Sequence, residues 1–131
     1  MTLIEHRLCF AGLALFLLAL LQGFAIPGFE RVDIARAAHA TALGSGTFLI
    51  AVGLLWPKLS FQRLAGTWAT LMVVSLYAIA VALTLSATYP AGGEAQHRVA
   101  ATITAVFGIG GAIALLVSMA AVMFACKPSR A

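Results

Sequence analysis

Four long apolar segments dominate this chain and constrain its fold more than any other feature of the sequence. Each segment is long enough to cross a bilayer as a helix, which takes about 20 residues. Prolines and glycines, which rarely continue a helix, follow the apolar segments. These boundaries predict an all-α fold, an integral membrane four-transmembrane-helix bundle that forms a single membrane domain over residues 1–131. The expected helices span residues 8–26, 37–56, 64–87 and 99–126.

The composition agrees with a membrane protein and excludes several soluble classes. Hydrophobic residues make up 63% of the chain and charged residues 9%, whereas soluble domains carry about 25% charged residues. In such a chain, a formal net charge of +4 is typical of membrane orientation signals and does not indicate nucleic-acid binding. The sequence contains no glycine-rich phosphate loop, no CxxC pair and no HExxH motif. We therefore expect a lipid bilayer as a partner and no nucleic acid.

The distribution of Lys and Arg predicts the orientation, because cytoplasmic loops of membrane proteins carry an excess of these residues. The two chain ends and the 57–63 connection carry more of them than the other two connections, which also contain Glu30, Asp33 and Glu94. Both termini are therefore expected on the cytoplasmic side of the inner membrane. The first apolar segment is interpreted as a retained helix and not a signal peptide, because no small-residue cleavage site follows it. The basic residues are Arg7, Lys58, Arg63, Lys127 and Arg130 on the first side and Arg31, Arg36 and Arg98 on the second.

Small residues recur at the spacing that lets two helices approach closely within a bilayer. Ala38, Ala42 and Gly46 lie four residues apart in the second segment, and Gly108 and Ala112 do so in the fourth. The simplest interpretation is close packing between helices. Space for a flat ligand or for a neighbouring subunit is the alternative.

The polar side chains inside the four segments exclude several kinds of chemistry. No Asp, Glu or Lys lies within them, whereas ion-coupled transporters and proton pumps usually depend on buried carboxylates. A hydrolase needs a nucleophile beside a base. Ser45 and His39 cannot form that pair directly, because they lie six residues apart on one helix and face different directions.

His39 and Tyr77 are the intramembrane side chains that most need an explanation. An imidazole near a helix start either lies at the membrane interface, bonded to lipid or backbone, or binds a metal ion. No second His lies one helical turn away, so a bare zinc site is not expected, whereas one axial His is sufficient for a haem. Tyr77 lies within the third segment, where its phenol either bonds a packing partner or donates to a substrate.

Three stretches of the sequence carry a resemblance to a known family. They are IEHRL at the start of the first helix, AHATALGSGTFLIAVGLLWPKL in the second helix and its exit, and LYAIAVALTLSATYPAG at the end of the third. Together they resemble the small four-helix membrane isomerases that include hydroxylaminobenzene mutase and styrene oxide isomerase. The resemblance implies that His39 is the axial ligand of haem b in a homotrimer. Arg36, three residues before His39, is expected to pair with a haem propionate, although its spacing differs from that in the isomerases. It also implies that the iron acts as a Lewis acid on the substrate oxygen. Ser45 and Tyr77 are expected to position the substrate.

The function implied by the resemblance is an isomerase or mutase that rearranges a small apolar aromatic N-hydroxy compound, as in the conversion of hydroxylaminobenzene to 2-aminophenol. The alternatives are an epoxide isomerase of the styrene oxide type and a haem-binding or accessory membrane protein without catalysis. The chain also differs from the family pattern. Ser45-Gly46 stands where the family has an asparagine-glycine pair, and Tyr77 is offset from the family tyrosine by about one helical turn.

Overall fold

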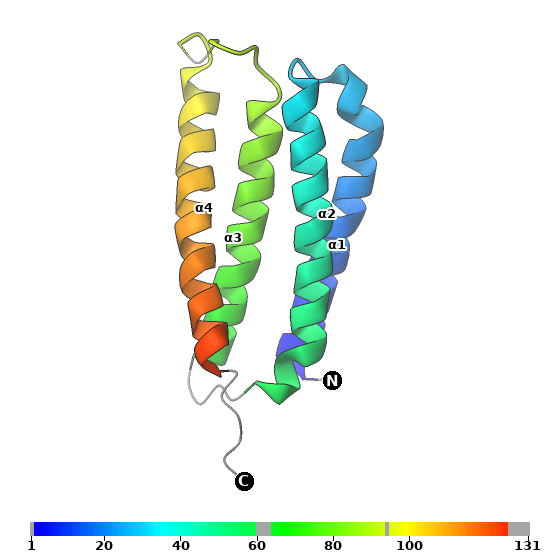
Figure 1. Cartoon of the computed structure of the whole chain (residues 1–131), viewed down its shortest axis with the longest axis vertical. Coiled ribbons are helices and arrows are strands. Elements are labelled where there is room, and N and C mark those ends of the chain that lie inside the picture. The colour runs from blue at the N-terminus through cyan, green and yellow to red at the C-terminus, as the bar shows by residue number, and fades with distance from the viewer. Residues whose placement is uncertain (1, 60–63, 94, 126–131) are drawn as a thin grey trace.

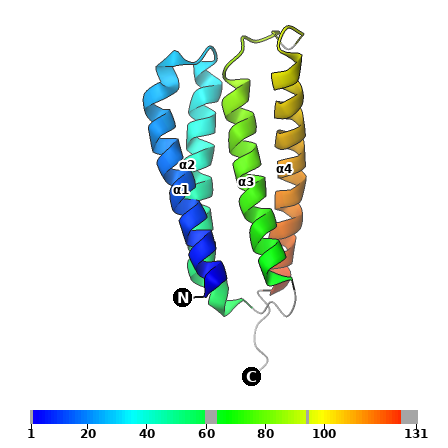
Figure 2. The same ribbon diagram turned by 180° about the vertical axis from the view of Figure 1, so that it is seen from behind.

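The computed structural model describes residues 2–59, 64–93 and 95–125 and confirms the all-α fold. All four long helices are apolar enough to cross a membrane, and the described part of the chain contains no strand. Helix α1 begins and α4 ends at the same end of the bundle (Figure 1, Figure 2). The protein is therefore an integral membrane protein built as a four-helix bundle. Its helices are α1 (Leu3–Ala25), α2 (Val32–Leu55), α3 (Ala65–Ser86) and α4 (Arg98–Ala125).

Two of the helices begin earlier than the apolar segments that predicted them. Helix α1 begins at Leu3 because Thr2 and Glu5 form a capping box: the Glu5 N–H donates to Thr2 Oγ1 over 3.3 Å, and the Glu5 carboxylate accepts from the Thr2 N–H. Helix α2 begins at Val32 and has Asp33 in its first turn. An acidic first turn favours a helix N-terminus but interrupts an apolar run, so hydropathy misses it. The other expected bounds lie within one residue of those observed, except that the predicted end at Cys126 lies outside the described residues.

Proline ends α1 and α2 in the same way. Pro27 lies in the 3-10 turn η1 (Ile26–Gly28) and Pro57 in the turn η2 (Trp56–Lys58), each directly after its helix. Proline has no N–H to continue the helical hydrogen-bond ladder, so the chain turns at these positions. After η1, the Arg31 N–H donates to the Ala87 carbonyl over 3.1 Å. This bond ties the start of α2 to the end of α3.

The bundle consists of two helix pairs, α1 with α2 and α3 with α4, which meet mainly through α2 and α3 (Figure 1). Within the first pair, the two backbones touch at Gly12 and Gly46. A Cβ added at Gly12 would lie 2.6 Å from the Gly46 carbonyl oxygen. Ala38, Ala42 and Gly46 are all buried, so the predicted packing stripe on α2 is confirmed.

The predicted packing stripe on α4 is wrong at one of its two positions. Gly108 faces α3, where an added Cβ would lie 3.7 Å from Ala82 Cβ, but Ala112 is exposed. Gly111 packs more closely, because a Cβ there would lie 3.0 Å from the Ser75 carbonyl oxygen. Helix α4 carries small residues around much of its circumference, so spacing alone did not identify the packed face.

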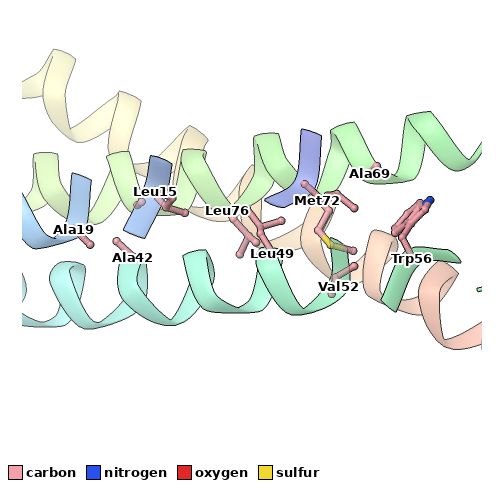
Figure 3. Close-up of a cluster of buried hydrophobic side chains, with 11 residues drawn as sticks. Leu15, Ala19, Ala42, Leu49, Val52, Trp56, Ala69, Met72 and Leu76 are labelled. Carbon is pink, nitrogen blue, oxygen red and sulfur yellow. The ribbon is translucent and has the colours of Figure 1, made fainter. Parts of the chain in front are cut away.

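A buried apolar cluster joins α1, α2 and α3 (Figure 3). Leu49 and Val52 of α2 lie beside Met72 and Leu76 of α3, and Trp56 closes the cluster where α2 ends. Helix α4 is peripheral to this cluster, and most of its apolar surface faces outward. Its buried residues are Gly111, Ser118 and Ala125.

Candidate functional site

His39 lies on α2 about two turns from the first residue of that helix, on the side that packs against α1. Its Nδ1 lies 2.8 Å from the carbonyl oxygen of Ala19. A carbonyl oxygen can only accept, so Nδ1 carries the proton and donates, and in the neutral ring Nε2 holds the free lone pair. Within the described part of the chain, Nε2 has no hydrogen-bond partner. Metal-binding imidazoles are oriented in this way, with one nitrogen held by the protein and the other left for the metal.

A glycine on α1 makes room for the His39 ring. A Cβ added at Gly23 would lie 3.0 Å from Cε1 and 3.4 Å from Nδ1 of His39. The ring therefore lies against the Gly23 backbone, one helical turn beyond Ala19. A larger side chain at this position would push the imidazole away from the Ala19 carbonyl. His39 as a whole is half-buried.

Arg36 lies one helical turn before His39 and is exposed. Its guanidinium forms no hydrogen bond or ion pair with the residues that the structure describes. It is therefore available to pair with a carboxylate of a group bound near His39.

Ser45 faces away from His39, toward α3 and α4. It is buried and lines a groove of about 360 Å³ whose other walls include Leu76 of α3 and Met119 of α4. The Ser45 hydroxyl makes no hydrogen bond with any described residue. It can therefore donate to a molecule that occupies this groove.

Tyr77 ties α3 to α1. Its hydroxyl donates to the Ala11 carbonyl over 2.8 Å, so the phenol has a packing partner in this structure. Tyr77 also lines two neighbouring cavities: one of about 640 Å³ walled by α1, α3 and α4, and one of about 290 Å³ walled mainly by α1 and α3. Tyr77 thus combines a structural bond with a place in a cavity wall.

A single chain does not bring the predicted site residues together. His39 packs on α1, Ser45 faces α3 and α4, and Tyr77 reaches α1 from α3. Of the three other site residues, only Arg36 lies beside His39, one helical turn away. The described residues also form no group of three or more His, Cys, Asp or Glu side chains suited to a metal ion. The donor at His39 is one imidazole nitrogen, which fits a metal that brings its other ligands with it, as a haem does.

Comparison with known proteins assigns the family. The styrene oxide isomerase family model matches residues 4–127. The chain belongs to the styrene oxide isomerase family. Family membership confirms the resemblance drawn from the three sequence stretches above.

Two curated relatives of this styrene oxide isomerase family member come from Ectopseudomonas oleovorans. Hydroxylaminobenzene mutase HabB is 37% identical over 92 residues, which cover 70% of this chain and 56% of that protein. Hydroxylaminobenzene mutase HabA is 34% identical over 87 residues, which cover 64% of this chain and 63% of that protein. The chain thus spans less than two thirds of the length of either relative. No solved structure is significantly similar to it.

The structure of this family member also joins two polar residues that the sequence analysis did not single out. Gln22 Nε2 donates to Thr84 Oγ1 over 3.0 Å, and the Thr84 hydroxyl donates to the Ala80 carbonyl over 2.8 Å. Gln22 precedes Gly23, so the pair lies at the depth of His39. The two residues are 62 positions apart, and the only signal in the sequence was an amide within an apolar segment.

Proposed function

We propose that this protein is a membrane isomerase that binds haem b through His39 and rearranges a small aromatic N-hydroxy compound of the hydroxylaminobenzene type. The observation that carries the proposal is the oriented imidazole, whose Nδ1–H is held by the Ala19 carbonyl. Family membership and the names of the two mutase relatives support the reaction class. Arg36 is assigned to a haem propionate because it lies one turn from His39 with its guanidinium unpaired among the described residues.

When bound, the haem supplies a Lewis acid for the substrate oxygen. The chain supplies position and a dry environment. Ala19 orients the imidazole, and Gly23 keeps the space for it clear. The hydroxyls of Ser45 and Tyr77 are assigned to position the substrate: Ser45 can donate to it, whereas the Tyr77 hydroxyl, whose proton bonds the Ala11 carbonyl, can accept from it. The cavity walls around Tyr77 are almost entirely apolar, which excludes water from a reaction that moves oxygen within one molecule.

We further propose a homo-oligomer, with the trimer as the number that the resemblance implies. The outward face of α2 carries exposed small residues at alternating spacings of three and four, the pattern of a close helix–helix contact in a membrane. His39 and Ser45 border this stripe on opposite sides of α2 but do not meet within one chain. A site that uses both residues therefore needs a second subunit. The stripe consists of Ala37, Ala40, Gly44, Thr47 and Ala51.

The proposed location is the inner membrane with both termini in the cytoplasm. The basis is the Lys and Arg distribution, together with the common end of the bundle at which α1 begins and α4 ends. Among the described residues, Arg7 and Lys58 lie toward that end, and Arg31, Arg36 and Arg98 toward the other. The remaining residues of the prediction, Arg63, Lys127 and Arg130, lie outside the described residues.

An epoxide isomerase of the styrene oxide type is the second candidate function. The match to the styrene oxide isomerase family model favours it. The third candidate, haem binding without catalysis, is favoured by Ser45, because a hydroxyl offers fewer hydrogen bonds than the amide that the resemblance places there.

Absorption spectroscopy with a histidine pair tests the proposal. Detergent-purified protein is expressed with haem supplied, and spectra are recorded oxidised and dithionite-reduced. We expect a Soret band in the wild type that is lost in His39→Ala. His97→Ala is the matched control, because His97 is exposed at the same end of the bundle and its ring stacks on the Tyr89 ring, away from His39. A Soret band that persists in His39→Ala refutes the ligand assignment.

An activity assay on the haem-loaded protein separates the three functions. Phenylhydroxylamine conversion to 2-aminophenol supports the N-hydroxy mutase, and styrene oxide conversion to phenylacetaldehyde supports the epoxide isomerase. Haem-loaded protein that converts neither compound supports the non-catalytic alternative.

A further inference from the structure

The smaller of the two cavities at Tyr77 has one polar end in an otherwise apolar wall. Its volume is about 290 Å³, close to the lower limit of about 300 Å³ for ligand pockets and suited to a compound with a single ring. Leu15 and Leu18 of α1 and Val81 of α3 supply apolar wall, whereas Gln22 and Thr84 supply the polar end. A cavity of this kind fixes a ligand by its polar groups and holds its ring by apolar contact.

This cavity adjoins the residues that hold His39. Ala19, whose carbonyl accepts the His39 bond, is part of the cavity wall. Ala42 is also part of the wall and lies one helical turn after His39 on the same face of α2. Gln22 precedes Gly23, the residue that makes room for the imidazole. The polar end of the cavity and the candidate iron ligand thus share one end of the bundle.

The hydrogen bonds of Thr84 determine how the Gln22 amide is turned. The Thr84 hydroxyl donates its only proton to the Ala80 carbonyl, so its oxygen must accept from Gln22. The amide nitrogen therefore faces Thr84, and the amide oxygen Oε1 faces elsewhere. Oε1 accepts no hydrogen bond from a described residue. It is accessible, because it does not belong to the fully buried polar atoms without a partner. Gln22 is one of the residues that line the cavity, so this accessible acceptor is the group that we assign to a ligand there.

We propose that this cavity binds the substrate with its ring against the apolar walls and its polar group on Gln22, and that Gln22 selects aromatic compounds that carry an N–H or O–H donor. The inference rests on the proposed isomerase function and names the residue that would set its substrate class. Ser45 of the same chain lines a different groove, so a contact between Ser45 and this substrate would have to come from a neighbouring subunit. An arylhydroxylamine or an aminophenol donates to Gln22 Oε1. An epoxide oxygen can only accept, so it leaves the amide oxygen unpaired in an apolar cavity.

Binding measurements on one variant pair test this assignment. Gln22→Met keeps the length of the side chain and removes the amide. Ser86→Ala is the matched control, because it removes a hydroxyl from the same end of α3 that bonds only its own helix, at the Leu83 carbonyl. Isothermal titration of detergent-purified protein compares 2-aminophenol, which carries donors, with toluene, which carries none. We expect Gln22→Met to weaken 2-aminophenol binding about 10-fold and to change toluene binding less than about 2-fold, with both affinities unchanged in Ser86→Ala.

The outcomes distinguish a failure of the inference about Gln22 from a failure of the proposed function. Three results would overturn the role of Gln22. The variant could lose affinity equally for 2-aminophenol and toluene, it could lose affinity for neither, or the wild type could fail to bind 2-aminophenol. If the wild type turns over phenylhydroxylamine while Gln22→Met behaves like the wild type, the function stands and the inference fails. If the wild type rearranges no substrate but binds 2-aminophenol in a Gln22-dependent way, the cavity assignment stands and the isomerase proposal fails.

Discussion

Replacing Gly46 with alanine tests the contact on which the position of His39 depends. A Cβ at residue 46 would lie 2.7 Å from the Gly12 carbonyl oxygen and 2.9 Å from the Phe16 nitrogen, both of them backbone atoms. The first distance is about 0.7 Å shorter than the 3.4 Å at which ordinary contact begins, so α1 must move away from α2 as a unit. Overpacking of this kind costs about 1–3 kcal/mol. Replacing glycine by alanine inside a helix offsets up to about 1 kcal/mol of that cost.

With an overpacking cost in the middle of this range, about 2 kcal/mol, and an offset of about 1 kcal/mol, we expect Gly46→Ala to lower the free energy of unfolding by about 1 kcal/mol. The same movement affects the site, because His39 Nδ1 and the Ala19 carbonyl oxygen belong to the two helices that separate. Their distance of 2.8 Å would rise to about 3.5 Å if the full displacement reached them, which is beyond hydrogen-bond range. Haem retention should then fall together with stability.

Equilibrium unfolding in mixed detergent and SDS, followed by tryptophan fluorescence, measures the stability change, and the Soret absorbance per protein measures haem retention. Gly110→Ala is the control, because Gly110 is exposed on α4 and an added Cβ would meet nothing within 4 Å. It should leave both readouts at or above the wild-type value. Wild-type stability in Gly46→Ala would refute the argument that the α1–α2 contact has no room for a methyl group.

Three further substitutions test other contacts. Gly23→Ala places a Cβ 3.0 Å from His39 Cε1 and should weaken haem binding several-fold, which haem titration measures. The free energy of unfolding should change little, because the gain in helix propensity offsets the lost hydrogen bond. Unchanged haem affinity would contradict this prediction. Tyr77→Phe removes the bond to the Ala11 carbonyl and should destabilise the protein by about 1 kcal/mol in SDS unfolding, whereas equal stability would show that this bond contributes nothing net. Gly44→Leu enlarges an exposed position where an added Cβ would meet nothing within 4 Å, so the fold of the monomer should be unaffected. The mass of the oligomer, measured by light scattering, should fall. An unchanged mass would place the subunit contact elsewhere.

Most of the fold could be predicted because a bilayer leaves few alternatives. A backbone within hydrocarbon must satisfy its own hydrogen bonds, so each apolar segment of sufficient length has to be a helix. Pro27 and Pro57 then end helices for a local reason, the missing N–H. The starts of α1 and α2 were misplaced because a capping box and an acidic first turn are polar features that hydropathy averages away.

Sequence alone therefore determined the number and type of the membrane-spanning helices and the family. It also identified His39 as the histidine that lies within an apolar segment. Those conclusions depend on local chemistry and on composition, which do not require knowledge of neighbours. Only the tertiary structure decided what each polar side chain meets. It placed His39 Nδ1 on Ala19, joined Gln22 to Thr84 and directed Ser45 to a different groove. These contacts depend on how the helices are rotated and how closely they approach. In a bilayer, small residues such as Gly12 and Gly46 determine that geometry, because two helix backbones can touch only where such residues face each other. Which small residues do so is a property of the tertiary structure.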